Sequence, residues 1–135
     1  MPTRIAIKHC PCDEQRAYAD CCAPLHEGAA ARSAEALMRS RYSAYALRLE
    51  PYLLATWHAS TRPASLSFGD ETLQAPKWLG LKILRHEMAP DGDAAIVEFV
   101  ARFRVGGGSA QRMREVSRFA RVDGRWFYLD GDVAE

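Results

Sequence analysis

All four cysteines of this 135-residue chain fall within thirteen consecutive positions near its N-terminus. Cys10-Pro-Cys12 is followed, after eight residues, by Cys21-Cys22. Two close pairs of thiolates can occupy the four corners of a tetrahedral zinc site, in which each Zn–S bond is about 2.3 Å long. Because four protein ligands leave no coordination position open, the spacing predicts one structural zinc ion held by Cys10, Cys12, Cys21 and Cys22.

Other interpretations of the cluster are open: disulfides, free or redox-active thiols, or buried and inert cysteines. Disulfides need an oxidising compartment, which nothing in the sequence indicates, and a bridge between the adjacent Cys21 and Cys22 would be strained. His9 and His26 flank the cluster and could each replace a thiolate, although an exposed polar role is the more frequent one. Chance clustering of every cysteine is improbable, so metal binding is the favoured interpretation.

Composition and charge exclude several classes of protein. Hydrophobic residues make up 48% of the chain and charged residues 26%, as in ordinary globular domains. The net charge of +1 argues against a protein whose main work is to coat nucleic acid. No apolar run approaches the roughly 18–20 residues of a transmembrane helix, and the first residues lack the pattern of a signal peptide. We therefore expect a cytoplasmic protein with no membrane association.

The order of patterns predicts an α+β fold, with helices preceding an antiparallel meander. Ser33 is a suitable N-cap for a first helix, and Pro51 begins a second, short helix over 51–57 that carries Trp57. Residues 59–77 are rich in Ser, Thr and Pro, which indicates a loop. Asp-Gly pairs and a glycine-rich segment mark turns between strand patterns. The predicted strands cover about 79–88, 94–105, 111–122 and 125–130.

The cysteine pattern resembles the SEC-C motif, the zinc-binding element at the C-terminus of the SecA translocation ATPase. Further segments, in order along the chain, resemble the bacterial YchJ family, also called UPF0225: 37–45, 52–58, 78–81, 99–103, 115–119 and 126–131. The resemblance implies an NTF2-like cone, in which helices pack on a curved antiparallel sheet. It divides the chain into a SEC-C-like zinc knuckle (1–28) and an NTF2-like α+β domain (29–135). It supplies no reaction, because the biochemical function of the family is unassigned.

Alternation along the strands predicts which side chains face the helices. A two-residue Asp-Gly hairpin places Phe119 beside Tyr128, and we expect Ala101 to lie opposite Glu115. Since a buried carboxylate needs partners, Glu115 either pairs with an arginine such as Arg39 or Arg41, or lies at the base of a small-molecule pocket. The candidate pocket residues are Tyr42, Trp57, His58, Phe99, Phe103, Glu115, Trp126, Tyr128 and Asp130.

Two functions are compatible with these patterns, and no catalytic residue is assigned. The first is a non-enzymatic interaction module, in which the zinc knuckle presents a rigid surface to a protein partner. The second is a small-molecule-binding or catalytic domain that uses the cone pocket. A filled cone with a salt-bridged Glu115 would favour the first, and an enclosed pocket with an unpaired carboxylate beside His58 or Tyr128 would favour the second. A small excess of basic residues in the N-terminal third weakly supports contact with nucleic acid or the ribosome.

Overall fold

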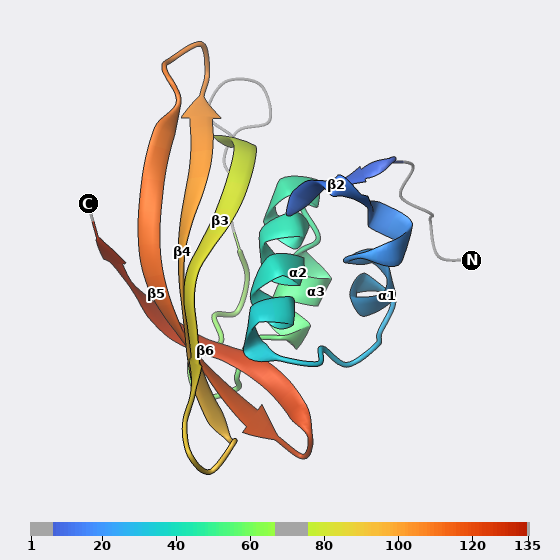
Figure 1. Cartoon of the computed structure of the whole chain (residues 1–135), viewed down its shortest axis with the longest axis vertical. Helices are drawn as coiled ribbons and strands as arrows, with labels where there is room; N and C mark the ends of the chain where they lie inside the picture. Colours follow the sequence, from blue (N-terminus) through green and yellow to red (C-terminus); the bar gives the residue numbers. More distant parts are fainter. Residues whose placement is uncertain (1–6, 67–75, 135) are drawn as a thin grey trace.

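The protein is built in layers, with one helix in the middle (Figure 1). The computed structural model describes residues 7–66 and 76–134. Helix α2 lies between the sheet β3–β6 on one side and the cysteine-bearing N-terminal segment on the other (Figure 1). The elements are β1 (His9–Cys10), β2 (Asp13–Ala17), η1 (Tyr18–Asp20), α1 (Ala23–His26), α2 (Ala34–Leu47), α3 (Glu50–Ala55), β3 (Pro76–Met88), β4 (Ala94–Val105), β5 (Gln111–Val122) and β6 (Arg125–Ala134).

The helix pair forms where the sequence predicts it, with a different end. The Ser33 hydroxyl accepts a hydrogen bond from the Ala36 N–H at 3.1 Å and so caps α2. The last residue of α2 is Leu47, and the following residue, Arg48, is its C-cap, with a left-handed backbone whose φ is 60°. The predicted inclusion of Trp57 in the second helix is wrong, because α3 ends at Ala55. Trp57 instead forms a parallel bridge to Tyr128 of β6, which ties the end of the helix pair to the sheet.

The sheet is an antiparallel meander in the order β3-β4-β5-β6, as predicted. Phe119 lies opposite Tyr128, which confirms the expected hairpin register. Between β4 and β5, Glu115 lies opposite Phe99 instead of Ala101. This displacement is two residues long, so it preserves the alternation and leaves Glu115 on the helix-facing side.

A β-bulge in β6 changes the face on which the last predicted pocket residue lies. The register shifts between Arg118 and Phe119, and Asp130 lies opposite Arg118. One extra residue in a strand exchanges inward and outward positions beyond the bulge. Asp130 is therefore exposed on the face away from the helices, where its carboxylate lies 2.5 Å from Arg118 Nε. The expectation that Asp130 shares a face with Glu115 is corrected by this bulge.

The core continues from the cysteines to the sheet without a break. Cys10, Cys22 and Tyr18 belong to the same buried cluster as Leu37 of α2 and Phe119 of β5. The proposed division at residue 28 stays a prediction, since the N-terminal segment buries its apolar surface against the same helix as the sheet does. Within residues 7–66 and 76–134, no helix is both long and apolar enough to cross a membrane.

Candidate functional site

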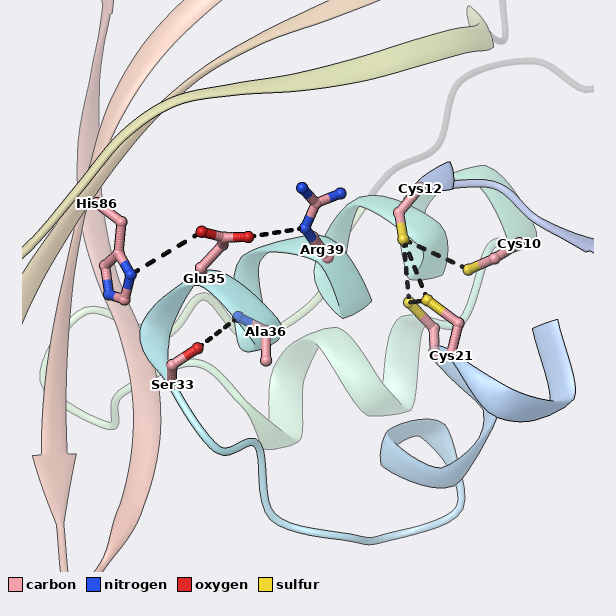
Figure 2. A network of polar contacts seen from close by, with 9 residues as sticks. Cys10, Cys12, Cys21, Ser33, Glu35, Ala36, Arg39 and His86 are labelled. Carbon is pink, nitrogen blue, oxygen red and sulfur yellow. Dashed lines mark hydrogen bonds and ion pairs between the residues drawn. The ribbon is translucent and has the colours of Figure 1, made fainter. Parts of the chain in front are cut away.

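The four cysteine sulfur atoms converge on one point beside α2 (Figure 2). All of them lie within 4.8 Å of one another. The separations are 3.5 Å for Cys10–Cys12, 3.5 Å for Cys12–Cys21, 3.7 Å for Cys12–Cys22 and 3.9 Å for Cys21–Cys22. A tetrahedral site with metal–sulfur bonds of about 2.3 Å has sulfur–sulfur edges of about 3.8 Å, so the donor set fits a zinc-sized cation. A disulfide requires about 2.05 Å, and all four cysteines are free thiols.

Local structure brings the two cysteine pairs together. Strands β1 and β2 form a tight hairpin whose turn contains Pro11 and carries the first pair. The Tyr18 N–H donates to the Lys8 carbonyl at 3.0 Å and closes the hairpin at its open end. Cys21 follows η1, and Cys22 is the N-cap residue of α1. The eight residues between the pairs form strand β2 followed by the short helix η1.

Helix α2 supplies polar contacts to the sulfur atoms. Ser43 is completely buried, and its Oγ lies 3.3 Å from Cys22 Sγ and 3.5 Å from Cys10 Sγ. A hydroxyl donor beside thiolates offsets their charge and orients them. One turn earlier, the Arg39 guanidinium binds Glu35 at 3.0 Å and lies on the side of Cys12 (Figure 2). Burial opposes its charge, but Glu35 and Cys12 raise the pKa of Arg39.

The thiols influence one another in a way that favours a cation. Contacts with Cys12 and Cys22 lower the pKa of Cys10, so a first thiolate forms readily. The contact with that Cys10 raises the pKa of Cys12 to about 12, and Cys22 is also shifted upward by Cys10 and Cys12. These opposed shifts in pKa disfavour four thiolates side by side without a positive charge among them. A divalent metal ion would supply that charge and displace the protons.

The two flanking histidines do not join the cluster. His9 is exposed. His26 is partly buried, and its Nδ1 and Nε2 lie 2.6 Å from the Tyr18 hydroxyl and 2.8 Å from the Ser40 carbonyl. Both ring nitrogens of His26 are occupied, so it anchors the N-terminal segment to α2. The expected exposed role is wrong for His26, and no spacing in the sequence indicated this long-range contact.

A cavity of about 270 Å³ lies between α2 and the sheet. Four candidate pocket residues line it: Tyr42, Phe99, Glu115 and Tyr128. Sequence reasoning did not include the other polar wall residues in the candidate set, namely Arg41, Tyr45 and Ser117. The sequence indicated Arg41 only as a possible ion-pair partner of Glu115, because which side chains of α2 border a cavity depends on how the sheet packs against the helix.

The remaining candidates lie outside this cavity wall. Trp57 packs edge-on against the cavity residue Tyr128, with 5.0 Å between ring centroids, but does not itself line the cavity. His58 lies in the following turn, where its Nδ1 accepts the Ser60 N–H at 3.1 Å. Phe103 packs against Trp78 at 5.6 Å, and Trp126 lines a separate hollow near the end of α1. These four and Asp130 do not line the cavity, although Trp57 and Phe103 each pack against a residue that does.

Glu115 has no salt bridge within the described part of the chain. Its Oε2 accepts a hydrogen bond from Ser117 Oγ at 2.5 Å. Arg39 is paired with Glu35 instead. Glu115 thus faces the cavity without the arginine partner that a purely structural role would require.

Arg41, although on the cavity wall, is held by α3 and by aromatic rings. It is 3% exposed, and its Nη1 donates to the Leu53 carbonyl at 2.8 Å and to Thr56 Oγ1 at 2.7 Å. Its guanidinium carbon lies 5.0 Å from the Trp57 ring centroid and 4.5 Å from that of Tyr128. The cavity wall therefore contains a fixed buried cation, Arg41, and the Glu115 carboxylate, which accepts a hydrogen bond from Ser117 and interacts electrostatically with Arg41.

Comparison with known proteins gives consistent matches. The family model described as YchJ, middle NTF2-like domain, matches residues 33–131. A UPF0225 protein of Xanthomonas campestris is 56% identical over 121 residues, which cover 90% of this chain and 92% of the relative. A UPF0225 protein of Ralstonia nicotianae is 47% identical over 142 residues, covering 98% and 96%.

Solved structures agree. The solution structure of a SEC-C motif containing protein from Rhodopseudomonas palustris superposes with a TM-score of 0.77 at 36% identity, covering 94% of this chain and 99% of that one. The crystal structure of a SEC-C motif containing protein from Psychrobacter arcticus gives a TM-score of 0.74 at 27% identity, covering 96% and 85%. With its four-cysteine cluster and NTF2-like domain, the chain belongs to the YchJ (UPF0225) family.

Proposed function

We propose that this protein is a small-molecule-binding domain of NTF2-like cone shape, stabilised at its N-terminal end by one structural Zn²⁺ ion. The observation that carries the proposal is the Glu115 carboxylate, which faces a cavity of about 270 Å³ and forms no ion pair with any described residue. Glu115 is half-buried, and partial burial of a carboxylate without an ion-pair partner is unfavourable. A ligand that donates hydrogen bonds to it would offset that cost.

Zinc is the metal that the donor set favours. Four thiolates at tetrahedral spacing select a soft or borderline cation, and zinc is the usual occupant of closed four-cysteine sites. The ion would be held by Cys10, Cys12, Cys21 and Cys22 and would crosslink the β1–β2 hairpin to the start of α1. Since the site requires reduced thiols, the cytoplasm is the compartment that suits it.

The walls of the cavity indicate the general chemistry of the ligand. Trp78, Phe99 and Met113 supply apolar surface, and the polar atoms belong to Arg41, Glu115, Ser117 and the tyrosines. The volume lies near the lower end of the range for small-molecule sites, about 300–1,000 Å³. A compact, largely apolar compound with an amine or hydroxyl donor fits this wall. Burial and the nearby Glu115 raise the pKa of Tyr128, so its hydroxyl stays protonated as a second donor.

A direct test compares two carboxylates on opposite faces of the same sheet. Ligand-observed NMR with a set of small aromatic amines is expected to show binding to the zinc-loaded wild type. Glu115→Gln should weaken binding at least about tenfold, as expected for loss of a charge-assisted hydrogen bond. Glu98→Gln is the matched control, because Glu98 pairs with Arg85 and Arg114 on the other face. Equal losses in the two variants would contradict the pocket as the binding site.

A second candidate function, a protein-interaction module, is favoured by a groove between the knuckle and the sheet edge. Residues 11–15, Arg39 and residues 79–83 line it. Strand β3 is an edge strand, whose free backbone groups can pair with an added strand. A photocrosslinking residue at Gln15 should yield a discrete crosslinked protein species in cells, whereas one at the distant, exposed Ser60 should not. Identical crosslinks from both positions would contradict this function.

A further inference from the structure

The face of the sheet that points away from the helices carries an unbalanced set of positive charges. The helices cover one face of the sheet, and no described element covers the other (Figure 1). Strand pairing aligns the basic residues of β3, β4 and β5 on this outer face near the β4–β5 turn. We call these residues the outer basic face: Lys77, Lys82, Arg102, Arg104, Arg112 and Arg114. Of these, Arg114 is paired with Glu98 at 3.3 Å, so the excess charge comes from the other residues.

Two of these arginines are direct cross-strand neighbours. Arg102 of β4 lies opposite Arg112 of β5, and both side chains are exposed. Like charges directly opposite one another in a sheet are destabilising. Among described residues, neither Arg102 nor Arg112 has a carboxylate within ion-pair distance. Elsewhere on the same face the pattern differs, because Arg118 binds Asp130 at 2.5 Å and Asp132 at 2.9 Å.

The charged pair borders a hollow instead of a flat surface. Gly80, Leu81, Lys82, Val100, Arg102 and Arg112 line a hollow of about 400 Å³. Gly80 has no side chain, and no heavy atom lies within 4 Å of the position a Cβ would take there. The register of β3 against β4 shifts between Trp78 and Gly80. Three cationic side chains, Lys82, Arg102 and Arg112, therefore border this recess together with Gly80.

We propose that the outer basic face binds the phosphate backbone of nucleic acid without regard to sequence. Cations in rows along three adjacent strands can contact several phosphates, more than one isolated anion presents. Base edges and base stacking are not involved, because the described residues on this face include no aromatic side chain near the pair. The net charge of the whole chain is only +1, so the attraction comes from this local face.

Fluorescence anisotropy with a labelled oligouridylate of about 20 nucleotides tests the proposal on the zinc-loaded full chain. We expect micromolar binding at about 50 mM salt. The slope of log Kobs against log salt should be about −2 to −3, as for three to four contacts of about 0.7 each. Arg102→Gln/Arg112→Gln should weaken binding at least about tenfold and make the slope shallower by about 1.4. Arg118→Gln is the matched control and should change affinity less than about twofold, because its charge is already paired.

Arg102→Lys/Arg112→Lys keeps both charges and should retain the slope, which separates loss of charge from loss of folding. Absence of binding by the wild type at about 50 mM salt overturns the proposal. So does an equal loss of affinity in Arg118→Gln. Binding to vesicles containing phosphatidylserine, together with failure to bind the oligonucleotide, would also overturn it in favour of a lipid surface. The outer basic face and the cavity lie on opposite sides of the sheet. A negative result for nucleic-acid binding therefore leaves the proposed small-molecule function unaffected.

Discussion

The hydroxyl of Ser43 lies 3.3 Å from the sulfur of Cys22, although the two residues are 21 positions apart in the chain. This contact joins the cysteine cluster to the helix that also covers the sheet. Ser43 is completely buried, and Ser40 on the same helix bonds His26 through its carbonyl. The cysteine cluster therefore forms part of the main core, and occupancy of this cluster by a metal ion should affect the stability of the whole domain.

Removal of the metal should destabilise the entire protein. Protein purified without added metal is expected to contain one zinc per chain by elemental analysis, and chelation should lower the midpoint of thermal unfolding in one cooperative transition. The reason is that Cys10 and Cys22 lie in the same buried cluster as Phe119. Calorimetry with and without chelator checks this. A complete absence of zinc, or an unchanged midpoint after its removal, would contradict the prediction.

Ser43→Ala should weaken zinc binding while the four cysteines remain in place. Loss of a polar partner of a metal ligand typically lowers metal affinity about 10–100-fold. Competition with a chromophoric chelator measures the change. Ser60→Ala is the control, because Ser60 is exposed and contacts His58 far from the sulfur atoms. Equal zinc affinity in wild type and Ser43→Ala would show that the hydroxyl does not support the metal.

Trp126→Ala should lower the free energy of unfolding by about 3–5 kcal/mol, as expected for truncation of a large aromatic residue in a core. Trp126 is 6% exposed and belongs to the main buried cluster. Urea denaturation measures the change. Val133→Ala is the control on the same strand, since Val133 is 61% exposed and its truncation should alter stability by less than about 0.5 kcal/mol. A loss below about 1 kcal/mol for Trp126→Ala would contradict its assigned place in the core.

Arg112→Gln should raise the free energy of unfolding by about 0.2–1 kcal/mol, because it removes the repulsion from Arg102 across the strands. Arg118→Gln should give no such gain, since Arg118 is paired with Asp130 and Asp132. Urea denaturation at low ionic strength is the suitable measurement, because salt screens exposed charges. A stability loss in Arg112→Gln would mean that Arg112 makes favourable contacts within the sheet.

The features that the sequence determined by itself are local. The spacing of the four cysteines identified a metal-binding set, because two pairs of adjacent thiols need little more than a hairpin and a turn to converge. Asp123-Gly124 determined the pairing of Phe119 with Tyr128, because a two-residue turn leaves one register available. The N-cap at Ser33 is local in the same sense.

Tertiary structure alone decided which polar side chains meet. A single bulge in β6 places Asp130 on the face opposite to Glu115, and no residue pattern in the sequence predicted this bulge. His26 contacts the carbonyl of Ser40, and Arg41 donates a hydrogen bond to the carbonyl of Leu53. Because every residue has a backbone carbonyl, the sequence does not identify which one serves as the acceptor. The physical reason is that strand and helix periods define faces, whereas the partners on a face depend on register and on packing between distant segments. Glu115 thus became a cavity residue only when helix and sheet were assembled.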